Sequence, residues 1–109
     1  MANPIQSVRV FAGTIKSERE DLRDIEVPAT LTLIERDQDY EFRFVMFVCG
    51  PLALNAVGQK SGSETPVFQG IAKDPRGWDV ICRAHLVGNR IMGSYDQPQD
   101  KGSFALEEV

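Results

Sequence analysis

The only histidine of the chain, His85, shares one face of a predicted strand with Asp79 and Arg83. A carboxylate beside a histidine is the beginning of a general acid-base pair. The sequence contains no phosphate-binding glycine loop, no nucleophile motif and no His-Glu-x-x-His zinc motif that would complete a catalytic site. We therefore expect His85 to be an ordinary exposed histidine and the protein not to be an enzyme.

The two cysteines, Cys49 and Cys82, are too few for a disulfide framework and lack the spacing of metal ligands. Cys82 falls on the apolar face of its strand, where a buried thiol is the ordinary expectation. The acidic residues between Glu18 and Glu26 lack the glycine and the alternation of an EF-hand loop. We expect them to be solvated, and the sequence predicts neither a metal nor a cofactor.

Three arginines, Arg9, Arg43 and Arg83, each alternate with residues that are expected to face inward, so they could meet on one outer face. Apolar side chains alternate in the same way, and a large exposed apolar patch marks a subunit or partner interface. The candidate interface residues are Arg43, Val45, Phe47, Ile81 and Arg83. Ordinary cross-strand pairing of the arginines with Glu41 and Asp79 is the alternative.

Short strands of alternating character must position these side chains. The clearest covers residues 40–48, whose inward face would carry Tyr40, Phe42, Phe44, Met46 and Val48. Three more strands, at 78–87, 90–95 and 103–106, are separated by Gly88-Asn89, which suits a tight hairpin, and by a polar loop at 96–102. Earlier strands are expected at 5–15, 27–36, 52–60 and 67–73. Residues 17–24 form either a solvated loop or a single helical turn.

About eight short strands at regular spacing, with no convincing long helix, indicate an all-β protein. Sequential short connections favour an antiparallel up-and-down meander that closes into a small barrel, because closure removes exposed strand edges. A sandwich is the alternative arrangement. The length of 109 residues fits a single domain over residues 1–109.

The segment from Gly88-Asn89-Arg90-Ile91-Met92-Gly93-Ser94-Tyr95 through Gly102-Ser103-Phe104-Ala105-Leu106 resembles the closing hairpins of small lipocalin-like (calycin) barrels. The Gly-x-Trp motif of true lipocalins is absent near Phe11-Ala12-Gly13. The resemblance implies a barrel that holds one small apolar molecule, which an eight-stranded barrel has room for. Candidate ligand-binding residues are the aromatic side chains expected to face inward, Tyr40, Phe42, Phe44, Trp78 and Tyr95. The same bulky side chains could instead fill the interior.

The acidic balance of the chain limits its partners. A net charge of -4 argues against nonspecific nucleic-acid binding, which depends on clustered lysine and arginine. No apolar run approaches the roughly 20 residues that cross a bilayer, and the N-terminus lacks a secretory signal, so we expect no membrane association and a cytoplasmic protein. Two functions stay open: a carrier of a small apolar ligand, or an interaction or inhibitor module whose outer face binds a second copy or another protein.

Overall fold

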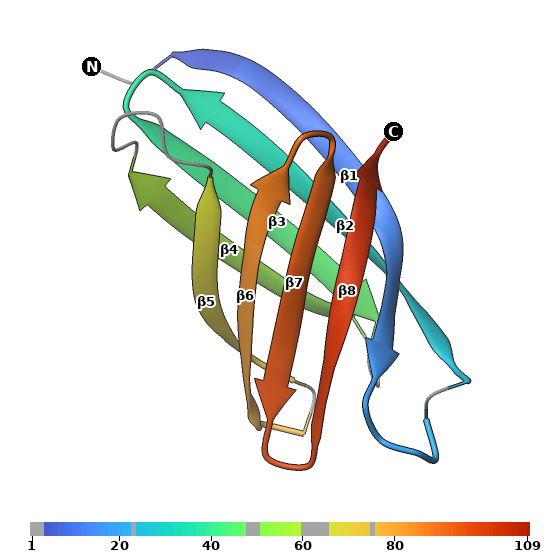
Figure 1. Cartoon of the computed structure of the whole chain (residues 1–109). Helices are drawn as coiled ribbons and strands as arrows, with labels where there is room; N and C mark the ends of the chain where they lie inside the picture. The colour runs from blue at the N-terminus through green and yellow to red at the C-terminus, as the bar shows by residue number, and fades with distance from the viewer. Residues whose placement is uncertain (1–3, 23, 48–50, 60–65, 75) are drawn as a thin grey trace.

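The computed structural model is an eight-stranded antiparallel meander, as the sequence predicts (Figure 1). The structure describes residues 4–22, 24–47, 51–59, 66–74 and 76–109. The strands are β1 (Ile5–Ser17), β2 (Glu26–Arg36), β3 (Asp39–Phe47), β4 (Pro51–Gln59), β5 (Val67–Lys73), β6 (Asp79–Val87), β7 (Arg90–Gln97) and β8 (Asp100–Glu108). The described part of the chain contains no α-helix, and after β1 it makes turns through Leu22 that are held by backbone hydrogen bonds.

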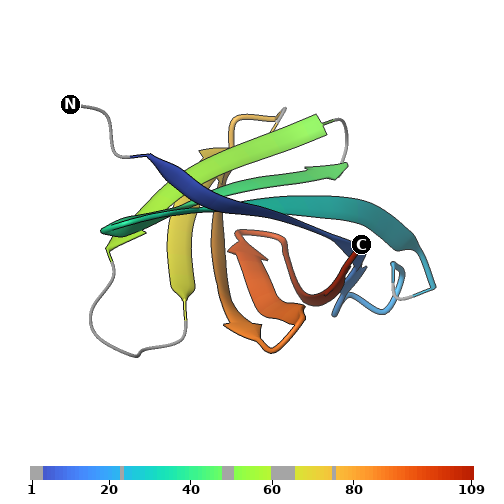
Figure 2. The same ribbon diagram turned by 90° about the horizontal axis from the view of Figure 1, so that it is seen from above.

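All strands belong to one sheet with the order β4-β3-β2-β1-β8-β7-β6-β5. Every pair of consecutive strands except β4 and β5 is joined by a ladder, and β8 returns to pair with β1. The sheet curls until its two outermost strands, β4 and β5, lie beside each other, which produces a nearly closed barrel (Figure 2). No backbone ladder joins the described residues of β4 and β5, so this seam differs from every other strand contact.

Side chains close the seam between β4 and β5. Leu54 of β4 lies so close over Gly70 of β5 that a Cβ at Gly70 would be 2.8 Å from the Leu54 Cδ2 atom. Phe42 of β3 and Phe68 of β5 stack inside, with ring centroids 4.7 Å apart. Apolar packing therefore takes the place of backbone hydrogen bonds where the barrel meets itself.

The inner face of the sheet forms one core. The predicted alternation in β3 and β6 is confirmed, because the side chains of Phe42, Phe44, Met46 and Cys82 are fully buried. The other fully buried large side chains come from β1, β2, β7 and β8: Phe11, Ile15, Leu31, Ile91 and Leu106. Burial of such side chains stabilises the fold by about 1.5 to 3 kcal/mol each.

The arrangement of β1 corrects one prediction. Phe11 is buried in the core, whereas Val8 and Val10 are 56% and 41% exposed. Arg9 therefore lies on the same side of β1 as Phe11, with its guanidinium 5.2 Å from the centre of the Phe11 ring. It does not share an outer face with the other two arginines. The first half of β1 extends past β8, which pairs with β1 only from Phe11 onward. Side chains on the inward side of this half are not enclosed by β8, so they need not be apolar.

Several strand boundaries also differ from the sequence prediction, most clearly around Trp78 and at the last hairpin. Trp78 precedes β6 instead of opening it. The last hairpin is tighter than the loop expected at 96–102, because Gln97 pairs with Asp100 and leaves a two-residue turn. Asp96 and Lys101 face each other across this hairpin, and the attraction between their opposite charges favours backbone pairing up to the turn. The predicted ends of two strands, Val48 and Lys60, fall outside the described residues, as does Cys49.

Candidate functional site

Four of the five candidate ligand-binding residues lie in the core inside the barrel or pack against it. Phe42 stacks on Phe68, and Phe44 packs against Phe104 with ring centroids 4.8 Å apart. Tyr40 is partly buried beside Phe42. Phe42 and Phe44 are therefore in contact with other rings of the core, at the place where the lipocalin-like hypothesis puts a ligand.

Tyr95 belongs to the same core, and its polar end already has a partner. Its hydroxyl donates a hydrogen bond to Asp100 Oδ2 at 2.8 Å, and the Ser17 hydroxyl donates to the other oxygen of Asp100. Burial, together with the neighbouring Asp100 carboxylate, raises the pKa of Tyr95 above its usual value. The two hydrogen bonds to Asp100 connect β7 and β1 to the start of β8.

Trp78 lies at the turn between β5 and β6, where it contacts Arg76. The Arg76 guanidinium is 4.1 Å from the centre of a Trp78 ring. The buried Asp74 carboxylate accepts hydrogen bonds from the backbone N–H groups of Arg76 and Trp78 and from the Arg76 guanidinium. Burial alone would raise the pKa of Asp74, but these hydrogen bonds together lower it. The arrangement fixes the turn and places Trp78 beside a charged group.

The candidate interface residues lie on two separate parts of the outer surface. Arg43, Val45 and Phe47 belong to β3, and Ile81 and Arg83 belong to β6. These strands are not neighbours in the sheet, since β4 and β5 lie between them on the shorter way around the barrel. Arg43 is paired with Glu41 at 2.5 Å, and Phe47 is 51% exposed.

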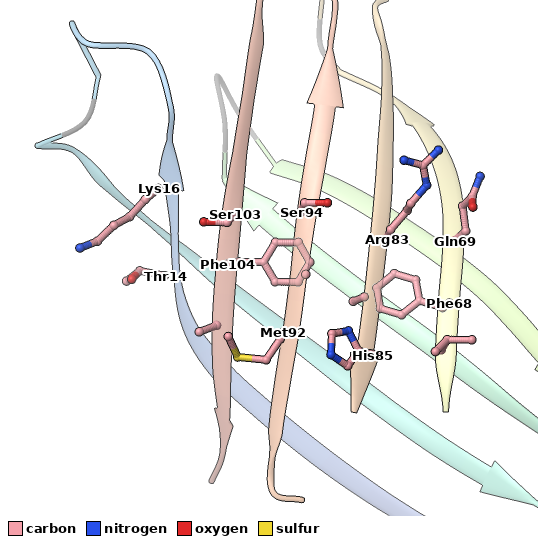
Figure 3. A pocket seen from close by; sticks show the side chains of 14 residues that line it. Thr14, Lys16, Phe68, Gln69, Arg83, His85, Met92, Ser94, Ser103 and Phe104 are labelled. Carbon is pink, nitrogen blue, oxygen red and sulfur yellow. The ribbon is translucent and has the colours of Figure 1, made fainter. Parts of the chain in front are cut away.

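A shallow groove of about 860 Å³ lies on the outer side of β1, β8, β7, β6 and β5 (Figure 3). Its floor is low because three of the outward side chains along its middle are small: Ser94, Ser103 and Ala105. Longer side chains border it, with Arg83 and His85 on β6 and Lys16 on β1. Of the interface residues predicted from the sequence, the groove contains only Arg83.

The strand register arranges the groove side chains in two parallel rows. One row is polar and consists of Gln69, Arg83, Ser94, Ser103 and Lys16. The next row is largely apolar and consists of Val67, His85, Met92, Ala105 and Thr14. Neighbouring strands are about 4.8 Å apart, so each row crosses the five strands over roughly 19 Å.

The charge of the groove is opposite to that of the whole protein. The chain has 16 acidic and 12 basic residues. The groove lining nevertheless includes Lys16, Arg83 and His85 and no acidic residue among those described. Lys16 is 3.6 Å from Glu26, with both side chains more than half exposed. The described lining of the groove therefore carries basic and no acidic side chains on a protein whose net charge is negative.

Arg83 differs from the other arginines that the structure describes. Six of them, Arg9, Arg19, Arg36, Arg43, Arg76 and Arg90, each have a carboxylate within 4 Å. The Arg83 side chain makes no ion pair or hydrogen bond with any described residue. Its guanidinium is available to bind an external anion.

Sequence reasoning missed the two serines in the middle of the groove. The alternation of β7 and β8 does place Ser94 and Ser103 on the outward face, so their exposure was readable from the pattern. Their position opposite each other, and beside Arg83 and Lys16, follows only from the register of the ladders.

Two further findings concern other kinds of site. Within the ranges that the structure describes, no group of three or more His, Cys, Asp or Glu residues could hold a metal ion. The same ranges contain no helix of the length and apolar character that crosses a membrane.

No protein-family model matches the chain, and no curated protein matches its sequence.

Proposed function

We propose that this protein is a non-enzymatic interaction module that binds an acidic, extended segment of a partner protein in the outer groove. The observation that carries the proposal is the basic groove, free of acidic residues in its described lining, on a protein with a net charge of -4. Electrostatic complementarity of this kind selects partners and accelerates their association.

The two rows of the groove specify the form of the segment. An extended chain presents successive side chains on opposite sides, at a rise of about 3.3 Å per residue. About six residues laid across the five strands could turn acidic side chains toward Arg83 and Lys16. Their alternate apolar side chains would then contact Val67 and Met92 in the other row.

The lipocalin-like alternative, with a small apolar ligand inside the barrel, has less support. Phe42 and Phe44 are fully buried and in contact with other rings, so a ligand would have to separate packed side chains. This hypothesis predicts that lipophilic compounds raise the melting temperature and alter Trp78 fluorescence. If a panel of such compounds does neither, interior binding is ruled out.

The proposed function is tested with a fluorescent peptide in which glutamate and valine alternate. Fluorescence anisotropy should show binding that weakens as salt is added, and a peptide of alternating lysine and valine should not bind. Arg83→Glu should weaken binding by about tenfold or more. Arg43→Glu is the matched control, because it reverses the same charge on β3 outside the groove.

Two outcomes would contradict the proposal. If the lysine peptide binds as tightly as the glutamate peptide, the groove does not select acidic segments. If Arg43→Glu weakens binding as much as Arg83→Glu does, the peptide is bound elsewhere. Native mass spectrometry of the free protein shows separately whether a second copy of the chain is its partner.

A further inference from the structure

We infer that the polar row of the groove recognises a phosphate group, carried on a phosphorylated serine or threonine of the partner's extended segment. This inference rests on the proposed function and names the side chain that the groove selects. Its basis is the position of two serines, Ser94 and Ser103, between Arg83 and Lys16 in one row of the groove (Figure 3). Arg83 has no carboxylate partner among the described residues.

The register brings four hydrogen-bond donors into one line. Ser94 of β7 lies opposite Ser103 of β8, Arg83 lies opposite Ser94, and Lys16 lies opposite Ser103. The two outer residues of this line are three strand spacings apart, or about 14 Å between backbones. Arginine and lysine side chains are long enough to reach inward from both ends, above the short serine side chains.

The number and charge of these donors suit phosphate better than carboxylate. A phosphorylated side chain carries about -1.5 to -2 charge and three strong acceptor oxygens. The planar arginine fork binds two oxygens at once, and the serine hydroxyls and the lysine can donate to the remaining lone pairs. A carboxylate carries a single negative charge and two acceptor oxygens instead of three, so it offers fewer acceptor positions and a weaker attraction to the same donors.

The four side chains are available for such a ligand. Arg83, Ser94 and Ser103 make no side-chain hydrogen bonds to other residues in the part of the chain that the structure describes. Within the described ranges, the Lys16 side chain has only the exposed contact with Glu26, a type of surface pair that contributes little to stability. Binding a phosphate would therefore break no strong interaction within the protein.

The test compares three peptides that differ at one central position, which carries phosphoserine, glutamate or serine, within the alternating sequence used above. We expect the phosphoserine peptide to bind about tenfold tighter than the glutamate peptide. A Ser94→Ala, Ser103→Ala double variant should reduce this difference while the glutamate peptide binds as before, and an unchanged difference would contradict the role of the serines. Arg83→Lys should weaken phosphopeptide binding because the two-oxygen contact is lost, whereas Arg43→Lys should not.

The outcomes separate this inference from the function on which it rests. If the glutamate and phosphoserine peptides bind equally, the phosphate inference fails and the acidic-segment function stands. If neither binds, both fail. If inorganic phosphate displaces the phosphopeptide at equal concentration, the site binds free phosphate, and the inference that the phosphate is recognised on a partner's segment is overturned. Binding to phosphatidic acid vesicles without binding to the phosphopeptide would overturn it as well, because the phosphate source would be a lipid.

Discussion

Cys82 is fully buried in the core, and burial raises the pKa of its thiol to about 12. Because the thiolate is the reactive form, we expect this thiol to resist modification in the folded protein. In a Cys49→Ser variant, a disulfide reagent at pH 8 should react only as fast as the protein unfolds, and at once after denaturant is added. Rapid reaction without denaturant would show that Cys82 is accessible.

The same shift predicts a loss of stability at high pH. The unfolded chain releases the Cys82 proton near the usual pKa of 9, whereas the folded protein keeps it until about pH 12. The contribution of the protonated thiol is therefore complete below pH 9 and decreases between pH 9 and 12. A Cys82→Ala variant in the same background should show a smaller decrease in the free energy of unfolding over this range.

The buried carboxylate of Asp74 should make stability sensitive to acid. Its pKa is lowered in the fold, so its stabilising effect is complete above the ordinary pKa of an aspartate and is lost as the pH falls below it. Asp74→Asn should lower the melting temperature at pH 7 and make it change less between pH 7 and pH 3. Asp21→Asn is the control, because the Asp21 carboxylate is exposed and, among the described residues, pairs only with Arg19. Equal effects of the two substitutions would contradict the structural role of Asp74.

The burial of single residues was predictable from the sequence where the side chain strongly prefers the core or the solvent. Phe42, Phe44 and Cys82 are buried as their alternation indicated, because apolar side chains in a regular strand have one favourable face. Arg9 was placed on the wrong side, since Val8 and Val10 gave β1 an apolar face that the fold leaves exposed. The pattern alone cannot show that this end of β1 extends past its neighbour.

Among the elements, β7 and β8 pack too closely to accept a side chain at Gly93. A Cβ at this position would overlap the Phe104 ring and would lie 2.5 Å from the backbone carbonyl oxygen of Arg83. Gly93→Ala should therefore destabilise the protein by about 1 to 3 kcal/mol, as overpacking of a core does. Urea denaturation measures this difference in the free energy of unfolding.

Gly70→Ala is the comparison for Gly93→Ala. At Gly70 the nearest atoms belong to the end of the Leu54 side chain, which can rotate away, whereas a backbone carbonyl cannot. We expect Gly70→Ala to lower the free energy of unfolding by less than Gly93→Ala does. The reverse order would mean that the contact between Leu54 and Gly70 is more rigid than the contact between β7 and β8.

The elements themselves were largely predictable, but their long-range pairing was not. The hairpin at Gly88-Asn89 follows from local turn chemistry, and it fixes Arg83 opposite Ser94. The position of Lys16 opposite Ser103 depends on the return of β8 to β1 across most of the chain. No local pattern encodes this register, which is why the sequence pointed to Arg83 but not to the groove that contains it.

At the scale of the whole molecule, the seam between β4 and β5 should be the weakest part of the barrel. Backbone amides there have no ladder partners among the described residues, so packing alone holds the strands together. Hydrogen exchange should show faster exchange for the β4 and β5 amides that point into the seam than for the amides between β7 and β8. Equal protection would mean that the seam is closed as firmly as the ladders.

Leu54→Ala tests whether apolar packing closes this seam. Leu54 is 3% exposed, so its truncation should destabilise the protein by about 2 to 5 kcal/mol. It should also speed exchange in β4 and β5 more than in β1 and β8. Leu31→Ala is the control, because Leu31 is equally buried on β2, a strand paired on both sides. If both variants speed exchange uniformly, the barrel opens as one cooperative unit. A selective effect of Leu54→Ala would instead show that the barrel opens first at the seam between β4 and β5, of which β5 also borders the groove.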